Sequence, residues 1–266
     1  MIPNFNLFGK EISPYMIAAI TGVLVILYFT DKSAKKQGLD QIHMLYMILF
    51  SFIGVIIGGH ILYGITNWQA IVYTLQNLHT LDSLPAFLER IARIFGGSVF
   101  YGGLIGAVFV SFLYLKHSRL PIGPYADAAA PAIPLFHFFG RLGCFLSGCC
   151  YGIPWAHGFV YAHSMVESAN GIPRFPVQLV EAFCNLLLFF VLYGCLKKGV
   201  LKNRLLAVYF SVYPVYRFAL EFLRGDEYRG FVGPLSTSQF ISLLLLLAAG
   251  GFWLWTVCRK RKLRDQ

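Results

Sequence analysis

The sequence predicts an all-α integral membrane protein with about seven transmembrane helices, and three observations lead to that prediction. The chain of 266 residues is 57% hydrophobic and 17% aromatic. Only 13% of its residues are charged, about half of the fraction found in soluble domains. Its apolar residues also form stretches of the length needed to cross a bilayer, about 20 residues each. An ordinary soluble domain is therefore excluded.

Seven apolar stretches are the predicted spans. They cover residues 13–30, 44–64, 97–115, 125–142, 177–196, 205–223 and 237–257. The first stretch is kept as a span because it lacks the basic segment and the small-residue cleavage site of a signal peptide. The fourth is interrupted by Pro131 and Pro134, and it contains Asp127. Proline is tolerated in a membrane helix when neighbouring groups satisfy the freed carbonyl groups, so this stretch is also counted.

The positive charges predict the orientation of the chain. Fourteen of the 22 lysines and arginines follow the first, third, fifth and seventh spans, at residues 32–36, 116–119, 197–204 and 259–264. All fourteen fall on one side of a seven-span chain, and the positive-inside rule makes that side cytoplasmic. The N-terminus is then outside and the C-terminus cytoplasmic. Because topology accounts for most of the net charge of +10, we expect no nucleic-acid partner.

Two segments lie outside this pattern, because neither contains an apolar stretch long enough to cross the membrane. Residues 65–96 contain Trp68 and the charged pair Glu89-Arg90, and we expect an amphipathic arm on the outer face. Residues 143–175 are predicted to form an outer-face cap. The chain shows no internal repeat and no low-complexity tract, so residues 1–266 are predicted to form a single transmembrane domain.

The remaining polar residues gather at the outer ends of spans three to seven. Gln178 and Glu181 are three residues apart, and Arg217 and Glu221 are four apart, so each pair shares one helix face. A guanidinium at the end of an apolar stretch is costly unless something anionic meets it. Arg141 and Arg217 therefore suggest a receptor for the phosphate of a lipid, in a shared cavity near the outer leaflet.

Structural alternatives exist for the same residues. In one alternative, Arg217 and Glu221 form an intramembrane salt bridge that only orients a helix. Arg141 has no carboxylate three or four residues away, so its partner comes from another helix or from a ligand. Glu181 is equally suited to pair with an arginine and to act as a catalytic group.

Glycines at the start of the third span allow two interpretations. Gly102, Gly103 and Gly106 are spaced to let two helices approach closely, which is the ordinary role of small residues in membrane helices. Glycine-rich backbone at the N-terminus of a helix can also present N–H groups to an anion.

The motif around Arg141 also contains three cysteines. Cys144, Cys149 and Cys150 follow the spacing Cys-x4-Cys-Cys, which matches no common structural zinc pattern, and a fourth ligand is not evident. We therefore expect no metal. A disulfide, a role in lining a pocket and simple packing as small apolar residues are the alternatives.

The ordered motifs resemble the bacterial prolipoprotein diacylglyceryl transferases over roughly residues 96–240. The resemblance is carried by Gly140-Arg141-Leu142-Gly143 with Gly148 and Gly152, by Arg174, Pro176, Gln178, Leu179 and Glu181, by Arg217, Phe218, Glu221, Phe222 and Arg224, and by Gln239. The glycine-rich segment 96–103 corresponds as well. The resemblance implies a multi-pass protein of the bacterial cell membrane whose active site faces the outer leaflet.

The resemblance also implies a reaction. Such enzymes move the diacylglyceryl group of phosphatidylglycerol to the lipobox cysteine thiol of a preprotein, and they release glycerol 1-phosphate without a metal or another cofactor. The implied catalytic residues are Arg141, Arg217, Tyr101 and Glu221. The implied lipid- and phosphate-binding residues are Gly102, Gly103, Arg174, Gln178, Glu181, Arg224 and Gln239. Cys144, Cys149 and Cys150 are expected on the acceptor side.

The sequence departs from the family pattern on that acceptor side. Tyr101 stands where the family usually has a histidine that is a proposed general base, and Phe175 stands where a second histidine is common. The run from Cys144 to Cys149 replaces two asparagines and a glutamate. The alternatives are therefore a paralogue that uses the same lipid donor with another acceptor, and a phospholipid-binding membrane protein without catalytic activity.

Overall fold

Seven helices of the computed structural model are long and apolar enough to cross a membrane. The structure describes residues 5–7, 9–78, 83–164, 166–226 and 230–264. The candidate spans within them are Pro14–Lys36, Gln41–Thr66, Phe100–His117, Ile122–Ser147, Val177–Lys198, Leu205–Leu223 and Thr237–Arg259. Each overlaps one predicted stretch, which confirms the prediction of an all-α, multi-pass membrane protein.

The elements follow one another in a simple order. The α-helices are α1 (Pro14–Lys36), α2 (Gln41–Thr66), α3 (Trp68–Gln76), α4 (Leu84–Phe95), α5 (Phe100–His117), α6 (Ile122–Ala129), α7 (Ala132–Ser147), α8 (Val177–Lys198), α9 (Leu205–Leu220) and α10 (Thr237–Arg264). Short 3-10 helices are η2 (Glu167–Ala169) and η3 (Glu221–Leu223). Three antiparallel strand pairs join β1 (Phe5–Leu7) to β2 (Lys10–Ile12), β3 (Pro154–Val160) to β4 (Pro173–Arg174), and β5 (Phe231–Val232) to β6 (Leu235–Ser236).

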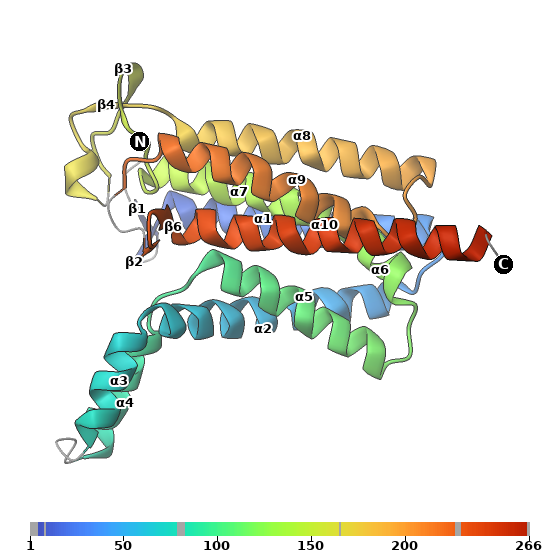
Figure 1. Ribbon diagram of the computed structural model, residues 1–266. Coiled ribbons are helices and arrows are strands. Elements are labelled where there is room, and N and C mark those ends of the chain that lie inside the picture. The colour runs from blue at the N-terminus through green and yellow to red at the C-terminus, as the bar shows by residue number, and fades with distance from the viewer. Residues whose placement is uncertain (1–4, 8, 79–82, 165, 227–229, 265–266) are drawn as a thin grey trace. The chain divides into compact units, whose positions relative to one another are not determined.

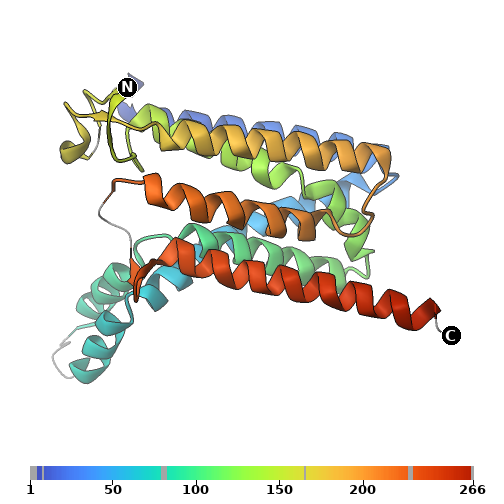
Figure 2. The ribbon, with the colours of Figure 1, turned by 45° about the horizontal axis from the view of Figure 1, so that its top comes forward.

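The chain divides into two compact units, residues 1–39 with 123–266 and residues 40–122. In the first unit α7 packs against α1 and α8, and α9 packs against α8 and α10. Because α7 and α9 run opposite to α8 and α10, one end of this unit collects the last turns of α7 and α9 and the first turns of α8 and α10 (Figures 1 and 2). The β3–β4 pair lies at the same end. The predicted site residues of this unit are thereby brought together.

The polar residue of the fourth span has a structural role. Ala130 and Pro131 separate α6 from α7, as the prolines predict. A carboxylate oxygen of Asp127 on α6 accepts a hydrogen bond from the backbone N–H of Leu205 at 2.9 Å, and the other accepts one from the N–H of Asn203. A carboxylate at the start of a helix satisfies donors that the helix leaves unpaired. Asp127 therefore anchors the first turn of α9.

The second unit is built on a close contact between α2 and α5. A Cβ atom on Gly58 would overlap the backbone oxygen of Gly102, and one on Gly106 would overlap that of Gly54. Glycine at these positions lets two helix backbones approach to contact distance. The predicted 65–96 arm contains α3 and α4, and the His60 imidazole lies 2.7 Å from the Phe95 carbonyl oxygen where α4 ends. Its location on a membrane surface stays a prediction.

Candidate functional site

A chain of ion pairs links α7, α8 and α9 at the end of the first unit described above. Nε of Arg141 on α7 lies 3.0 Å from Oε2 of Glu181 on α8. The other oxygen of Glu181 lies 3.9 Å from Nε of Arg217 on α9. The partner of Arg141, which sequence spacing leaves open, is thus a carboxylate from another helix. Glu181 thus lies within ion-pair distance of two arginines.

Arg217 is held from three sides. Besides Glu181, its Nη1 lies 2.7 Å from Oε2 of Glu221, one helical turn further along the chain, and its Nη2 donates to Oγ of Ser238 on α10 at 3.0 Å. The pairing of Arg217 with Glu221 is the one that their four-residue spacing predicts. With a protein partner at each nitrogen of its guanidinium group, Arg217 joins α8, α9 and α10.

The network continues past α9. Nε of Arg224 lies 4.0 Å from Glu221, and its guanidinium makes two hydrogen bonds to the carboxylate of Asp226, one of them 2.9 Å from Nε to Oδ1. Burial alone would lower the pKa of Arg224, but the hydrogen bond and charge of Asp226 raise the pKa above its ordinary value. Three arginines thus meet three carboxylates, and the network is close to electrically neutral without a ligand.

Exposure distinguishes the two central arginines. The side chain of Arg141 is 16% exposed, whereas that of Arg217 is 4% exposed and that of Glu181 is 3% exposed. A ligand therefore reaches Arg141 with less rearrangement than it needs to reach Arg217. A buried, oriented guanidinium is suited to stabilise negative charge that develops on a phosphate oxygen, because its planar fork matches two oxygens at once.

Gln178 fixes the turn that follows α7. Its Nε2 donates to the carbonyl oxygen of Cys149 at 2.8 Å and lies 3.0 Å from the hydroxyl of Tyr161. Both Gln178 and Tyr161 are buried. Burial raises the pKa of the Tyr161 phenol, which keeps the hydroxyl protonated. The amide of Gln178, predicted to bind lipid, is thus used within the protein to hold the backbone beside Arg141.

Arg174 organises the segment between α7 and α8. Its guanidinium donates to the carbonyl oxygens of Ala169, Gly152 and Ser168, at 3.3, 3.4 and 2.7 Å, and stacks 4.2 Å from the centre of the Tyr151 ring. Buried arginines that bond carbonyl groups tie irregular backbone together. The first residues of the predicted cap, 143–147, belong to the last turn of α7. In the rest of the cap, the buried Arg174 holds the irregular backbone together through these carbonyl groups.

Gln239, in the first turn of α10, forms a capping box with Ser236. Its side-chain oxygen accepts from the backbone N–H of Ser236 at 3.0 Å, and the hydroxyl of Ser236 accepts from the N–H of Gln239 at 3.2 Å. Such reciprocal bonds satisfy donors at the start of a helix. The Ser-x-x-Gln pattern was a visible sequence signal for this structural role. A contact of Gln239 with lipid stays a prediction.

Tyr101, Gly102 and Gly103 belong to the second unit. Tyr101 is buried in the first turn of α5. Gly102 faces the backbone of Gly58, and a Cβ atom on Gly103 would lie 3.2 Å from the side chain of Val55. Both glycines are therefore part of the contact with α2, as the packing interpretation expects. Their role toward an anion stays a prediction.

Several polar residues around the network were not singled out from the sequence. His137 stands one turn before Arg141 on α7 and interacts electrostatically with Arg141 and Glu181. Asn185 donates to the Glu181 carbonyl oxygen at 2.8 Å and accepts from the hydroxyl of Tyr216 at 2.9 Å. Their four-residue spacing from Arg141 and Glu181 was the available signal, because such residues share a helix face.

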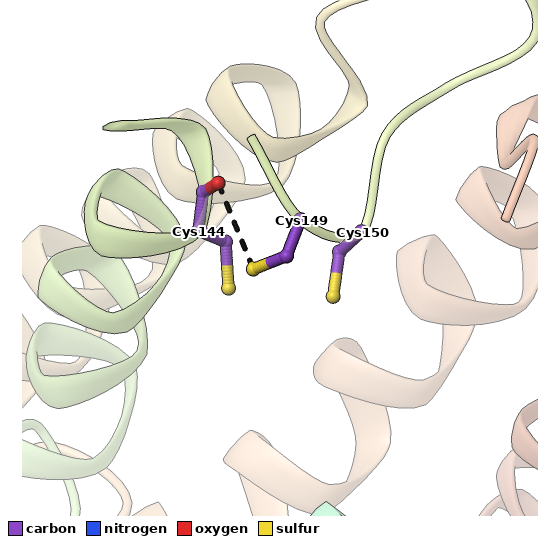
Figure 3. Close-up of side chains that lie close together, drawn as sticks. All are labelled: Cys144, Cys149 and Cys150. Atoms are coloured by element: carbon purple, nitrogen blue, oxygen red, sulfur yellow. Dashed lines mark hydrogen bonds between the residues drawn. The ribbon is translucent and has the colours of Figure 1, made fainter. Parts of the chain in front are cut away.

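The three cysteines of the motif converge. Their Sγ atoms all lie within 4.8 Å of one another, and Figure 3 shows Cys149 between Cys144 and Cys150. Gly148 has a φ of 74°, which ends α7 and turns the chain back, and Cys150 has a φ of 55°. The Cys149 thiol lies 3.7 Å from the carbonyl oxygen of Cys144. All three cysteines are free thiols.

Taken together, the helices and the arginine–carboxylate network define a multi-pass membrane protein with a polar site between apolar spans. The family model described as prolipoprotein diacylglyceryl transferase matches residues 4–255, and the chain belongs to that family. It is 35% identical to the phosphatidylglycerol–prolipoprotein diacylglyceryl transferase of Clostridium tetani, over 97% of this chain and 98% of the relative. A second relative, phosphatidylglycerol–prolipoprotein diacylglyceryl transferase 2 of Clostridium perfringens, is 32% identical over 95% of this chain and 93% of its own length.

Proposed function

We propose that this protein transfers the diacylglyceryl group of phosphatidylglycerol to a cysteine thiol of a prolipoprotein. The names of the relatives in Clostridium tetani and Clostridium perfringens support this donor and this acceptor. The observation that supports the site is the position of Arg141, which belongs to a buried ion-pair network yet keeps 16% of its side chain exposed. That combination gives a lipid phosphate an oriented guanidinium to bind.

The reaction balances without a redox partner. The acceptor sulfur attacks the glyceryl carbon that bears the phosphate ester, so that a carbon–sulfur bond forms as the carbon–oxygen bond breaks. Glycerol 1-phosphate leaves with the electron pair, and the thiol proton passes to a base or to solvent. Negative charge grows on the departing phosphate, where a preorganised donor contributes about 2.7–4 kcal/mol. Arg141 is the residue in place for this contact.

Two carboxylates of the network, Glu181 and Glu221, have a positioning role in the proposed reaction. Glu181 holds Nε of Arg141 at 3.0 Å, which fixes the direction of the guanidinium plane. Glu221 and Ser238 hold Arg217, so Arg217 in turn fixes Glu181. A site whose donors are already oriented spends no free energy on reorganisation when charge develops.

The finer parts of the proposal concern location and partners. The fourteen basic residues that follow alternate spans support an orientation in which the network end of the helices faces the outer leaflet of a bacterial cell membrane. The acceptor is a lipobox cysteine of a preprotein, and the protein has no nucleic-acid partner. The arm at residues 65–96 and the cap at residues 143–175 lie on the outer face in this arrangement.

Reconstituted protein tests the proposal. Vesicles that contain phosphatidylglycerol are mixed with a lipobox peptide, and the product is identified by mass spectrometry as a thioether-linked lipopeptide. We expect product with the cysteine peptide and none with its serine counterpart. Arg141→Ala should abolish the product, whereas Arg93→Ala, at an exposed surface ion pair with Glu89, should not. Absence of lipopeptide from well-folded wild-type protein would refute the proposal.

A further inference from the structure

We propose that Cys144, Cys149 and Cys150 bind one Zn²⁺ ion, and that the ion binds and ionises the acceptor thiol. This inference rests on the proposed function for the identity of the acceptor. It departs from the expectation of no metal, which the sequence spacing alone supported. The geometry of the thiols is the reason for the departure.

The three sulfur atoms are close to the arrangement that zinc requires. Zinc–sulfur bonds of about 2.3 Å in a tetrahedral site place the sulfur atoms about 3.8 Å apart. The three Sγ atoms lie within 4.8 Å of one another, so binding requires only small side-chain movements (Figure 3). The Cys149 thiol would exchange its weak bond to the Cys144 carbonyl oxygen for a bond to the metal.

The backbone holds the ligands in this arrangement. Gly148 in a left-handed conformation reverses the chain after Cys144, and Cys150 adopts a φ of 55° that non-glycine residues rarely take. Gln178 holds the carbonyl oxygen of Cys149 from α8 at 2.8 Å. Strained backbone that surrounding contacts maintain is typical of functional positions.

The number of ligands indicates the kind of site. In the described part of the chain, no histidine, aspartate or glutamate joins the three cysteines in the cluster. Structural zinc sites have four protein ligands, whereas catalytic sites have three and bind water or substrate at the fourth position. The cysteine motif lacks a fourth ligand, which argues against a structural zinc site. A catalytic zinc site needs three protein ligands and an open fourth position, so the same three cysteines suit it.

The charge of the surroundings also fits. Zinc with three thiolates carries a net charge of −1, and a bound substrate thiolate makes it −2. The guanidinium groups of Arg141 and Arg224 both interact electrostatically with the Cys150 thiol, and that of Arg141 also with the Cys144 thiol, so two arginines lie near the cluster. Arg141 is also the proposed phosphate receptor, so the acceptor sulfur and the donor lipid would bind near the same residue.

The proposed step is a metal-assisted thiol alkylation. The acceptor thiol binds zinc and loses its proton to solvent, because a thiol that coordinates zinc is deprotonated outright. The zinc-bound sulfur attacks the glyceryl carbon, the carbon–oxygen bond to phosphate breaks, and the neutral thioether dissociates from the metal. Zinc undergoes no redox change. This supplies the thiol activation for which the family histidine, here Tyr101, is a proposed base.

Metal content is the first test. Purified full-length protein in detergent is equilibrated with Zn²⁺, dialysed and measured by inductively coupled plasma mass spectrometry. We expect one zinc per chain, and a loss of at least tenfold in bound zinc for Cys144→Ser, Cys149→Ser and Cys150→Ser. Cys195→Ser on α8 is the matched control and should keep the metal. Unchanged zinc in the three variants, or binding of Cu⁺ but not Zn²⁺, would overturn the proposal.

A spectroscopic test avoids variants that fail to fold. Co²⁺ added to the wild-type protein should give the absorption of a thiolate-bound cobalt, and a lipobox peptide should change its visible bands. The serine counterpart of the peptide should leave the bands unaltered. Cobalt bands that respond equally to both peptides, or no thiolate absorption at all, would contradict a site that binds the acceptor thiol.

Activity separates the inference from the proposed function. Chelated, zinc-free protein should form lipopeptide at least about tenfold more slowly at pH 7, where a free thiol of pKa about 8.5 is only a few per cent ionised. Added Zn²⁺ should restore the rate. Full activity without metal would overturn the zinc proposal and leave the function intact. Stoichiometric zinc and a thiol-specific cobalt change without any lipopeptide would support the zinc site and refute the function.

Discussion

Nε of Arg141 and Oε2 of Glu181 lie 3.0 Å apart, and the two residues belong to different membrane-spanning helices. This ion pair joins α7 to α8 and orients the one arginine of the central pair that keeps appreciable exposure. The other carboxylate oxygen of Glu181 lies 3.9 Å from Nε of Arg217, so a single carboxylate faces both arginines. This shared carboxylate connects the two central arginines.

The first prediction concerns that carboxylate. Glu181→Gln keeps the shape of the side chain but removes the charge that faces Arg141 and Arg217. Loss of one partner of a buried ion pair typically costs about 3–5 kcal/mol, because the remaining charge is uncompensated. We therefore expect a large drop in the melting temperature of the detergent-purified protein.

The control for this change is Glu89→Gln. Glu89 pairs with Arg93 on α4, but both side chains are mostly exposed. Exposed pairs contribute at most about 1 kcal/mol, so the melting temperature should hardly change. Equal changes in melting temperature for Glu181→Gln and Glu89→Gln would mean that the charge of Glu181 does not stabilise the buried arginines.

The second prediction concerns the contact between α2 and α5. A methyl group at Gly102 would collide with the backbone oxygen of Gly58, which cannot move away as a side chain can. Gly102→Ala should destabilise the protein by about 1–3 kcal/mol, the usual cost of overpacking. Gly250→Ala on α10 is the control, because its Cβ would meet no described atom within 4 Å. A Gly102→Ala protein as stable as the control would refute the packing role.

The third prediction concerns the start of α9. Asp127→Ala removes the acceptor for the N–H groups of Asn203 and Leu205, and loss of such a cap costs about 0.5–2 kcal/mol. Asp127→Asn keeps one acceptor oxygen and should retain most of the stability. Thermal unfolding of the two variants measures the difference. If the alanine variant is no less stable than the asparagine variant, the capping role is wrong.

The fourth prediction concerns Tyr101. By its resemblance to the family, this residue takes the position of a histidine, and its hydroxyl is the only polar group that Tyr101→Phe removes. We expect a partial loss of lipopeptide formation with little change in melting temperature. Rates of the two proteins at equal folded concentration provide the measurement. An unchanged rate would exclude an acid–base or hydrogen-bond role for the hydroxyl in the reaction.

The spans could be predicted from the sequence because hydrophobicity and length decide them locally. The same is true of Arg217 with Glu221, whose pairing follows from four-residue spacing on one helix. The partner of Arg141 could not be predicted, since it depends on which face of α8 packs against α7. Helix–helix register in a membrane is set by side-chain packing, which hydrophobicity alone does not encode.

The structural roles of the other site residues could be predicted from the sequence only in part. Ser236 and Gln239 form a capping box that is visible in the sequence. Arg174 gave no such signal, because its three carbonyl partners lie in irregular backbone. The convergence of the cysteines depends on the left-handed conformation of Gly148, which ends α7. Glycine is common at such a position, but the spacing of the cysteines does not predict the direction that the chain takes after it.

The most direct test of the central claim is a measurement of lipid binding and transfer with Arg141→Lys. Lysine keeps the positive charge opposite Glu181 but loses the planar fork that matches two phosphate oxygens. Native mass spectrometry compares retention of phosphatidylglycerol with that of diacylglycerol, and the lipopeptide assay gives the rate. We predict that the variant stays folded, loses its preference for the phosphate-bearing lipid and forms lipopeptide about 10²–10³ times more slowly. A folded variant with wild-type preference and wild-type rate would contradict the assignment of Arg141 as the phosphate receptor.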